Sequence, residues 1–335
     1  MTDRQPVTFA NRRGERLVGI VHAPADRGSD TAVVLLSPGV KTRVAPHRLY
    51  NKLTEALVAQ GYWVFRFDFY GLGDSEGEVD ETYLADLYGS VALGRYIDDT
   101  RDALDWMERH YPIQRFVVGG LCGGAITGLM ACSRDPRVAG LIALGLPITV
   151  EGRGVDKVAQ MTDGQLARIR QGYLRKLFDP RSWARLLTLQ TDVRLLTRAF
   201  RKPVQTPKAA TAAAVAPGAS PDAGAGPAAA PAPTSNLNPY FAPAFFAAAD
   251  RGMRMLLIFS ETDRLWWEFE EKFLRAHPGV LDRYASRVSV TVVAEANHIF
   301  TLEPWQREAE RRLTAWLESE IGVAPVGGAV RPHAS

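Results

Sequence analysis

The chain has 335 residues, of which 46% are hydrophobic and 23% charged, as expected for a globular protein with one large core or two smaller ones. Its net charge of +3 is too small to indicate nucleic-acid binding, and two cysteines exclude a disulfide framework. Its first residues lack the apolar core of a signal peptide, and no stretch has 18 uninterrupted apolar residues. We therefore expect a cytoplasmic protein without a membrane span.

Strand and helix signals alternate along the first 150 residues, which favours an α/β fold with a mostly parallel sheet. Residues 7–10 and 16–22 flank Asn11-Arg12-Arg13-Gly14 and predict an opening hairpin. Apolar runs predict further strands at residues 31–37, 62–67, 115–119 and 138–144. Amphipathic spacing predicts helices at residues 47–60 and 98–110.

The alternation stops after residue 150. Residues 151–202 show helical spacing and predict a lid inserted between core strands, as insertions at strand ends commonly cover active sites. Residues 203–239 are rich in Ala, Pro and Gly and predict a disordered linker. Residues 151–208 hold 13 Lys and Arg against 5 Asp and Glu. This charge is either a solvated helical face or an attraction for an anionic substrate, an acyl carrier or coenzyme A.

The α/β pattern returns in the last third of the chain. Residues 254–260 and 287–293 predict two strands, and residues 302–318 predict an amphipathic helix. We therefore expect a core formed by residues 1–150 and 251–322, followed by a flexible tail at residues 323–335.

Cys122 stands in the run Gly120-Leu121-Cys122-Gly123-Gly124, directly after an apolar strand. Strand, glycine-flanked turn and helix form the context of the nucleophile elbow, G-x-S-x-G, with cysteine in place of serine. The start of a helix also favours a thiolate. The alternative is that Cys122 is a small buried apolar group.

An acid and a histidine follow Cys122 in the order that a nucleophile, acid and base triad has in such folds. Asp263 comes just past the strand at residues 254–260, and His298 lies in the loop after the strand at residues 287–293. Glu261 competes with Asp263 for the acid position, and Asp263 could instead cap a helix. His47 is a second candidate for the base. We expect Cys122, Asp263 and His298 to be the catalytic residues.

An oxyanion hole needs two backbone N–H groups aimed at the substrate carbonyl oxygen. Gly123 should provide one, and the loop Ser37-Pro38-Gly39-Val40-Lys41 the other. Val40 is the expected donor in this loop, with Lys41 as the alternative. No cofactor and no metal ion are expected.

These motifs resemble the α/β-hydrolase superfamily over residues 31–150 and 251–320. Arg66-Phe67-Asp68-Phe69-Tyr70-Gly71-Leu72-Gly73-Asp74-Ser75 is similar to the D-x-x-G-x-G-x-S turn of that superfamily. Residues 38–50 resemble the serine-aminopeptidase branch and, within it, the hydrolases associated with the exosortase A system, which can carry a Gly-Leu-Cys elbow. The resemblance implies an α/β-hydrolase fold, a mostly parallel central sheet flanked by helices, with an inserted helical lid. Dienelactone hydrolases and polyhydroxyalkanoate synthases use cysteine in the same elbow.

The function predicted from these residues is hydrolysis of an ester or thioester through a Cys-His-Asp triad and a covalent acyl-enzyme. The substrate would be a small molecule or a carrier-bound acyl group, and no nucleic-acid partner is expected. Two alternatives stay open. One is an acyltransferase or a thioesterase for a carrier protein or coenzyme A, and the other is a non-catalytic binding protein on the same scaffold.

Overall fold

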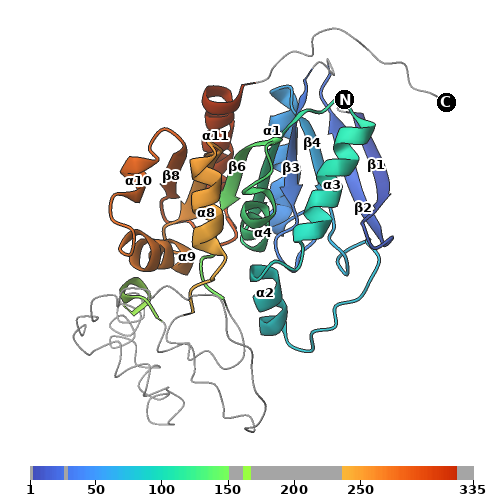
Figure 1. Ribbon diagram of the computed structural model, residues 1–335. Helices are drawn as coiled ribbons and strands as arrows, with labels where there is room; N and C mark the ends of the chain where they lie inside the picture. The colour runs from blue at the N-terminus through green and yellow to red at the C-terminus, as the bar shows by residue number, and fades with distance from the viewer. Residues whose placement is uncertain (1–2, 26–28, 151–160, 167–235, 323–335) are drawn as a thin grey trace, which may run out of the picture. The chain divides into compact units, whose positions relative to one another are not determined.

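The computed structural model describes residues 3–25, 29–150, 161–166 and 236–322 (Figure 1). The chain divides into two units, residues 1–153 with 236–335 and residues 154–235. The second unit contributes only residues 161–166. There the backbone N–H of Thr162 donates to the side chain of Gln165, and the backbone N–H of Gln165 donates to the side chain of Thr162, as in a capping box. The rest of the predicted lid, the linker up to residue 235 and the predicted tail lie outside the described residues.

One sheet with helices on both faces forms the first unit (Figure 1). Its strands are β1 (Asp3–Ala10), β2 (Arg16–Ala23), β3 (Thr31–Leu36), β4 (Trp63–Phe67), β5 (Arg115–Leu121), β6 (Val138–Leu144), β7 (Arg254–Ser260) and β8 (Val288–Val293). Its helices are α1 (Leu49–Ala59), α2 (Leu84–Ala92), α3 (Ile97–His110), α4 (Gly123–Cys132), α8 (Phe241–Asp250), α9 (Arg264–Glu268), α10 (Val280–Arg283) and α11 (Glu303–Trp316).

The strands are ordered β1-β2-β4-β3-β5-β6-β7-β8. β2 is antiparallel to β1 and to β4, whereas all later neighbours are parallel. The parallel strands β3 and β4 are buried along their whole length, because helices cover both faces of the sheet. The prediction of an α/β fold with a mostly parallel sheet flanked by helices is confirmed.

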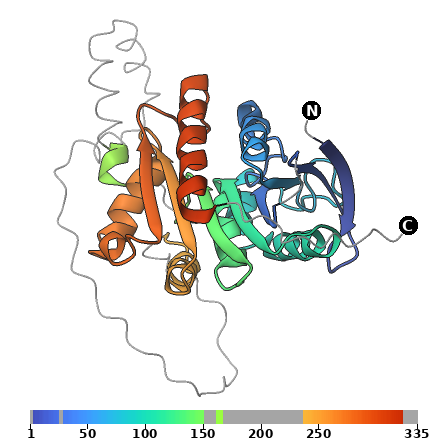
Figure 2. The same ribbon diagram turned by 90° about the horizontal axis from the view of Figure 1, so that it is seen from above.

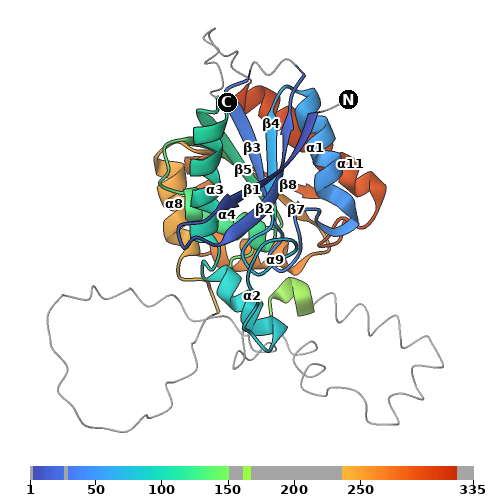
Figure 3. The ribbon, with the colours of Figure 1, turned by 90° about the vertical axis from the view of Figure 1, so that its right-hand side faces the viewer.

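Two hydrophobic clusters lie on opposite faces of the sheet. One combines strand residues with α1 and α11, and the other combines them with α2, α3, α4 and α8. Viewed from above, α1 and α11 lie on one side of the strands (Figure 2). Parallel strands place their carboxyl ends at one edge, and both α2 and α9 lie at this edge (Figures 1 and 3). Loops that leave this edge are where α/β proteins place their sites.

The predicted strands and helices are found with shifts of a few residues at their ends. The sequence patterns missed α2, α8 and α10, and indicated α9 only as the helix that Asp263 could cap. The described chain also resumes at Asn236, before the predicted linker ends at residue 239. Leu237 there forms an antiparallel bridge with Thr149, and the Val150 N–H donates to the Asn236 carbonyl at 2.9 Å. The two ends of the insertion are thus adjacent.

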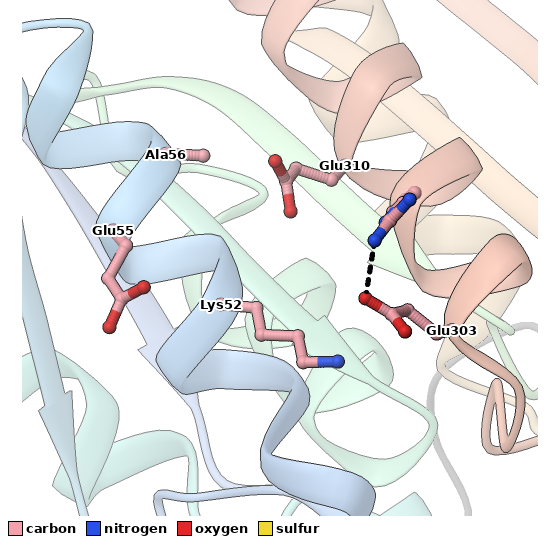
Figure 4. Close-up of a pocket in the computed structure, with 6 residues that line it drawn as sticks. Lys52, Glu55, Ala56, Glu303 and Glu310 are labelled. Carbon is pink, nitrogen blue, oxygen red and sulfur yellow. Dashed lines mark hydrogen bonds and ion pairs between the residues drawn. The ribbon is translucent and has the colours of Figure 1, made fainter.

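A groove of about 380 Å³ lies between α1 and α11 (Figure 4). Its lining mixes two basic and three acidic side chains with one alanine: Lys52, Arg307, Glu55, Glu303, Glu310 and Ala56. Arg307 pairs with Glu303 at 2.7 Å, as the dashed line in Figure 4 shows. None of these residues is a predicted catalytic residue.

A buried polar cluster lies under the hairpin. The His22 ring is 3% exposed, and its Nε2 lies 3.2 Å from Nη2 of Arg66. Burial, together with the charge of Arg66, lowers the pKa of His22 to about 4. Arg66 also donates to the side chain of Asn51 at 2.6 Å and to the Arg43 carbonyl at 3.1 Å. His22 is therefore a neutral structural residue near pH 7.

Within the described ranges, we find no helix with both the length and the apolar character needed to cross a bilayer.

Candidate active site

Cys122 occupies a strained turn between β5 and α4. Its φ of 53° and ψ of −112° belong to a region that non-glycine residues rarely adopt, and such strain concentrates at functional sites. The glycines around it are required by close packing. A Cβ on Gly124 would lie 2.5 Å from the Leu36 carbonyl oxygen, and one on Gly123 would lie 2.5 Å from Cα of Gly39. The turn therefore accepts no added side-chain atom at either position.

Tyr50 of α1 ties the strand ends beneath this turn together. Its hydroxyl donates to the Leu36 carbonyl at 2.8 Å and accepts from the Leu121 N–H at 2.7 Å. Leu36 ends β3, and Leu121 precedes the nucleophile. Complete burial raises the pKa of Tyr50, so the phenol stays neutral and can donate. The sequence analysis missed this residue, because no local pattern relates a helix tyrosine to a strand 71 residues away.

Asp263 and His298 are joined by a 2.6 Å hydrogen bond between Oδ2 and Nδ1. Asp263 is 6% exposed, and its other oxygen accepts from the Leu265 N–H, so it also caps α9. Cys122 is close enough to the His298 ring to affect its pKa. Burial disfavours the imidazolium, but the interactions with Asp263 and Cys122 outweigh it and raise the pKa of His298 to about 10. The three predicted catalytic side chains therefore lie close together, with Asp263 and His298 hydrogen-bonded to each other.

The two competing candidates lie elsewhere. Glu261 accepts from the backbone N–H of Glu295 at 2.7 Å, so its carboxylate holds the loop that leads to His298. His47 is an exposed residue in the turn Pro46–Arg48, where it has a positive φ of 54°. Neither replaces a member of the Cys122, His298 and Asp263 group.

The loop after β3 brings Gly39 against Gly123. Gly39 has a φ of 58°, which favours glycine. The Lys41 N–H donates to the Pro38 carbonyl at 3.1 Å. Among the residues that the structure describes, the N–H groups of Val40 and Gly123 have no hydrogen-bond partner. Two free donors therefore lie in adjacent turns, as an oxyanion hole requires.

Arg43 fixes the same loop from the other side. Its backbone N–H donates to Oδ1 of Asp68 at 2.6 Å, and its guanidinium pairs with both Asp68 and Asp74. Asp68 is fully buried in the turn after β4 that the sequence analysis identified. The acid of this turn therefore holds the loop that contains Val40.

Gly145, just after β6, lies beside the acid and the histidine. A Cβ there would be 3.6 Å from Oδ2 of Asp263 and 3.8 Å from Cε1 of His298. The sequence analysis did not single out Gly145, because its positive φ of 61° is seen only in the structure. Among the described residues, no cluster of three or more His, Cys, Asp or Glu side chains could hold a metal ion.

Solved structures of other proteins share this fold. The esterase Pf2001 of Pyrococcus furiosus has 19% identity and a TM-score of 0.54, with 96% of this chain and 92% of that chain covered. An alpha-beta serine hydrolase homologue from Coxiella burnetii has 16% identity and a TM-score of 0.50, with 93% and 98% covered. These likenesses show the fold. No curated protein matches the chain significantly.

A family model described as serine aminopeptidase, S33, matches residues 28–199, a little over half of the chain. The sheet order and the elbow are those of the α/β-hydrolase fold, and the predicted superfamily is confirmed. The chain therefore belongs to the serine aminopeptidase S33 family of α/β-hydrolases.

Proposed function

We propose that the protein hydrolyses a carboxylic ester or thioester, with Cys122 as nucleophile, His298 as general base and acid, and Asp263 as its orienting acid. The observation that carries this proposal is the hydrogen-bonded pair of Asp263 and His298 close to Cys122, which occupies a strained turn. The esterase among the structural neighbours adds support for an ester substrate.

The reaction would begin with attack of the Cys122 sulfur on the substrate carbonyl carbon. A C–S bond forms, and the carbonyl π electrons move to the oxygen, which the N–H groups of Gly123 and Val40 stabilise. Collapse of this intermediate breaks the bond to the leaving group, which takes the proton from Nε2 of His298. The product of this half-reaction is a thioester on Cys122.

Water would complete the cycle. His298, now neutral, removes a proton from water while the oxygen attacks the thioester carbonyl. The intermediate releases the carboxylic acid, and the sulfur leaves with the proton held on His298. Asp263 keeps Nδ1 of His298 protonated throughout, so that Nε2 faces the sulfur.

Cysteine in place of serine changes the resting state. A protonated imidazole stabilises a neighbouring thiolate, and the raised pKa of His298 favours the imidazolium at neutral pH. A thiolate attacks esters and thioesters readily, and the imidazolium can protonate a departing alkoxide.

Two finer assignments belong to the same proposal. For the second oxyanion donor we choose Val40 over Lys41, because the Lys41 N–H is already bonded to Pro38. Within the family we propose the branch associated with the exosortase A system, on the Gly-Leu-Cys elbow. The basic segment that motivated an acyltransferase or carrier-protein thioesterase lies almost entirely outside the described residues, and nothing adds to that alternative.

The test is acylation by p-nitrophenyl acetate, followed by nitrophenol release and by intact mass. Wild-type protein should show a burst and an adduct of one acetyl group, and Cys122→Ala should show neither. Cys122→Ser is the matched variant, in which His298 must deprotonate an alcohol, so turnover should fall strongly. Wild-type turnover in Cys122→Ala would refute the proposal.

A further inference from the structure

The loop that carries His298 contains a strained residue. Phe300 is fully buried and has a positive φ of 50°, a conformation that a bulky side chain rarely adopts. Such strain persists only where the surrounding structure holds the backbone in place. The Phe300 N–H donates to the Asn297 carbonyl at 3.1 Å, and the Asn297 side chain bonds both the N–H and the hydroxyl of Thr301. These contacts shape the loop from within.

Gln306 of α11 attaches this loop to the helices that cover the sheet. It is 3% exposed, and its Nε2 donates to the Phe300 carbonyl at 2.8 Å. Its Oε1 accepts from Nζ of Lys52 at 2.6 Å, and the Lys52 side chain extends from α1 toward α11 (Figure 4). Each end of this buried amide therefore has a partner, and the two partners belong to different elements. Gln306 is the middle of a hydrogen-bonded path from α1 to the carbonyl two residues after His298.

The other end of this path is α1, which also supports the nucleophile turn. Tyr50, two residues before Lys52, bonds the two strand ends beneath Cys122. α1 thus supports the nucleophile turn through one side chain and the histidine loop through another. Nearby residues of one helix therefore fix the two halves of the site relative to each other.

We propose that Gln306 is a positioning residue for His298 and acts through the Phe300 carbonyl. Lys52 anchors it to α1. This role rests on the proposed hydrolysis at Cys122 and adds two residues to it, neither of which touches the substrate. Without the Gln306 amide the strained loop can relax, and the imidazole moves relative to Cys122. A displacement of about 1 Å can cost up to about a hundredfold in rate, because the reacting groups must be aligned.

The test compares Gln306→Leu with Gln60→Leu. Gln60 is the matched control, because its Nε2 also donates to a backbone carbonyl of α11, that of Thr314 at 3.1 Å, about two turns further along the helix. With p-nitrophenyl acetate, Gln306→Leu should lower kcat about tenfold and leave KM within about twofold, since alignment is lost but not substrate contact. Gln60→Leu should keep kcat within about twofold of wild type.

A second variant removes the anchor and leaves the buried amide in place. Lys52→Met should lower kcat about threefold, because Gln306 then keeps only its bond to Phe300. Combined with Gln306→Leu it should cause no further loss, because the two residues act in one path. Losses that simply multiply in the double variant would show that Lys52 does not act through Gln306.

A spectroscopic readout does not depend on turnover. The nitrogen chemical shifts of the His298 ring, assigned by comparison with His298→Gln, report its protonation and its hydrogen bond to Asp263. They should change in Gln306→Leu and match wild type in Gln60→Leu. That result supports the positioning role even if wild type hydrolyses no ester, in which case the proposed hydrolysis alone has failed.

Two results would overturn the positioning role and leave hydrolysis by Cys122 intact. One is unchanged His298 shifts in folded Gln306→Leu protein, and the other is an equal kcat in the two glutamine variants of an active enzyme. Gln306 would then only stabilise the start of α11. If Gln306→Leu does not fold, the same two measurements on Lys52→Met decide.

Discussion

The two sides of the proposed site are held by different forces. The nucleophile turn depends on steric fit, with Gly123 and Gly124 packed against the backbone of the loop after β3. The acid and base side depends on side-chain hydrogen bonds, in which Asp263 accepts from His298 and Glu261 accepts from the backbone N–H of Glu295. We infer that the first side tolerates no added atom, whereas the second tolerates isosteric changes outside the Asp263 and His298 pair.

The largest effect is expected on the hydrogen-bonded side. Asp263→Asn keeps the shape but loses the charge that orients and stabilises the His298 imidazolium, so kcat should fall at least about a hundredfold. Glu261→Gln is the control, since an amide oxygen still accepts from the Glu295 N–H; its kcat should fall less than about fivefold. Steady-state kinetics with p-nitrophenyl acetate measure both. Equal losses would show that the two carboxylates share the acid role.

Substitutions on the steric side should lower the free energy of unfolding. In Gly124→Ala the new Cβ would meet the backbone oxygen of Leu36, which cannot move without disturbing β3, so we expect a loss of about 3 kcal/mol. Gly252→Ala is the control for an added Cβ that meets no neighbour, because Gly252 has open space around it; its positive φ alone should cost about 1 kcal/mol. Urea unfolding gives both values. A Gly124→Ala protein as stable as Gly252→Ala would mean that the turn is not close-packed.

Tyr50→Phe tests a polar contact on the steric side. It leaves the Leu36 carbonyl and the Leu121 N–H buried without their partner, at a cost of about 2 kcal/mol. Tyr62→Phe serves as the comparison, since the Tyr62 hydroxyl makes a single long bond of 3.3 Å to Leu317. Its cost should be below about 1 kcal/mol. Urea unfolding measures the free energy of unfolding of both variants. Equal costs would mean that the Tyr50 hydroxyl does not stabilise the turn.

The smallest effect on stability is expected from removing the insertion. Val150 and Asn236 are hydrogen-bonded, so residues 151–235 can be replaced by a two-residue Asn-Gly turn that continues the bridge. The core should unfold within about 1 kcal/mol of the full chain, because surface insertions contribute little to the fold that carries them. Thermal unfolding measures this. A melting temperature lower by 10 °C or more would show that residues 151–235 stabilise the core.

The sequence predicts the parts of this fold that depend on local pattern. Buried strands such as β7 are apolar runs, and Asp263 and His298 are found because each follows such a run. α2 was missed because two glycines interrupt the segment from Leu84 to Gly94 and exposed leucines weaken its amphipathic pattern. The roles of Tyr50 and Glu261 could not be predicted, since their contacts join segments distant in the sequence.

The buried His22 gives the hydrolase a built-in sensitivity to acid. Its pKa is about 4 in the folded chain and near 6.5 when exposed, so below neutral pH the unfolded chain binds the proton more readily. The contribution to folding is fully present above about pH 6.5 and is lost progressively as the pH falls toward 4. His22→Gln should therefore flatten the melting temperature across this interval relative to wild type. Through this residue, mild acid weakens the fold at pH values above those at which exposed carboxylates are neutralised.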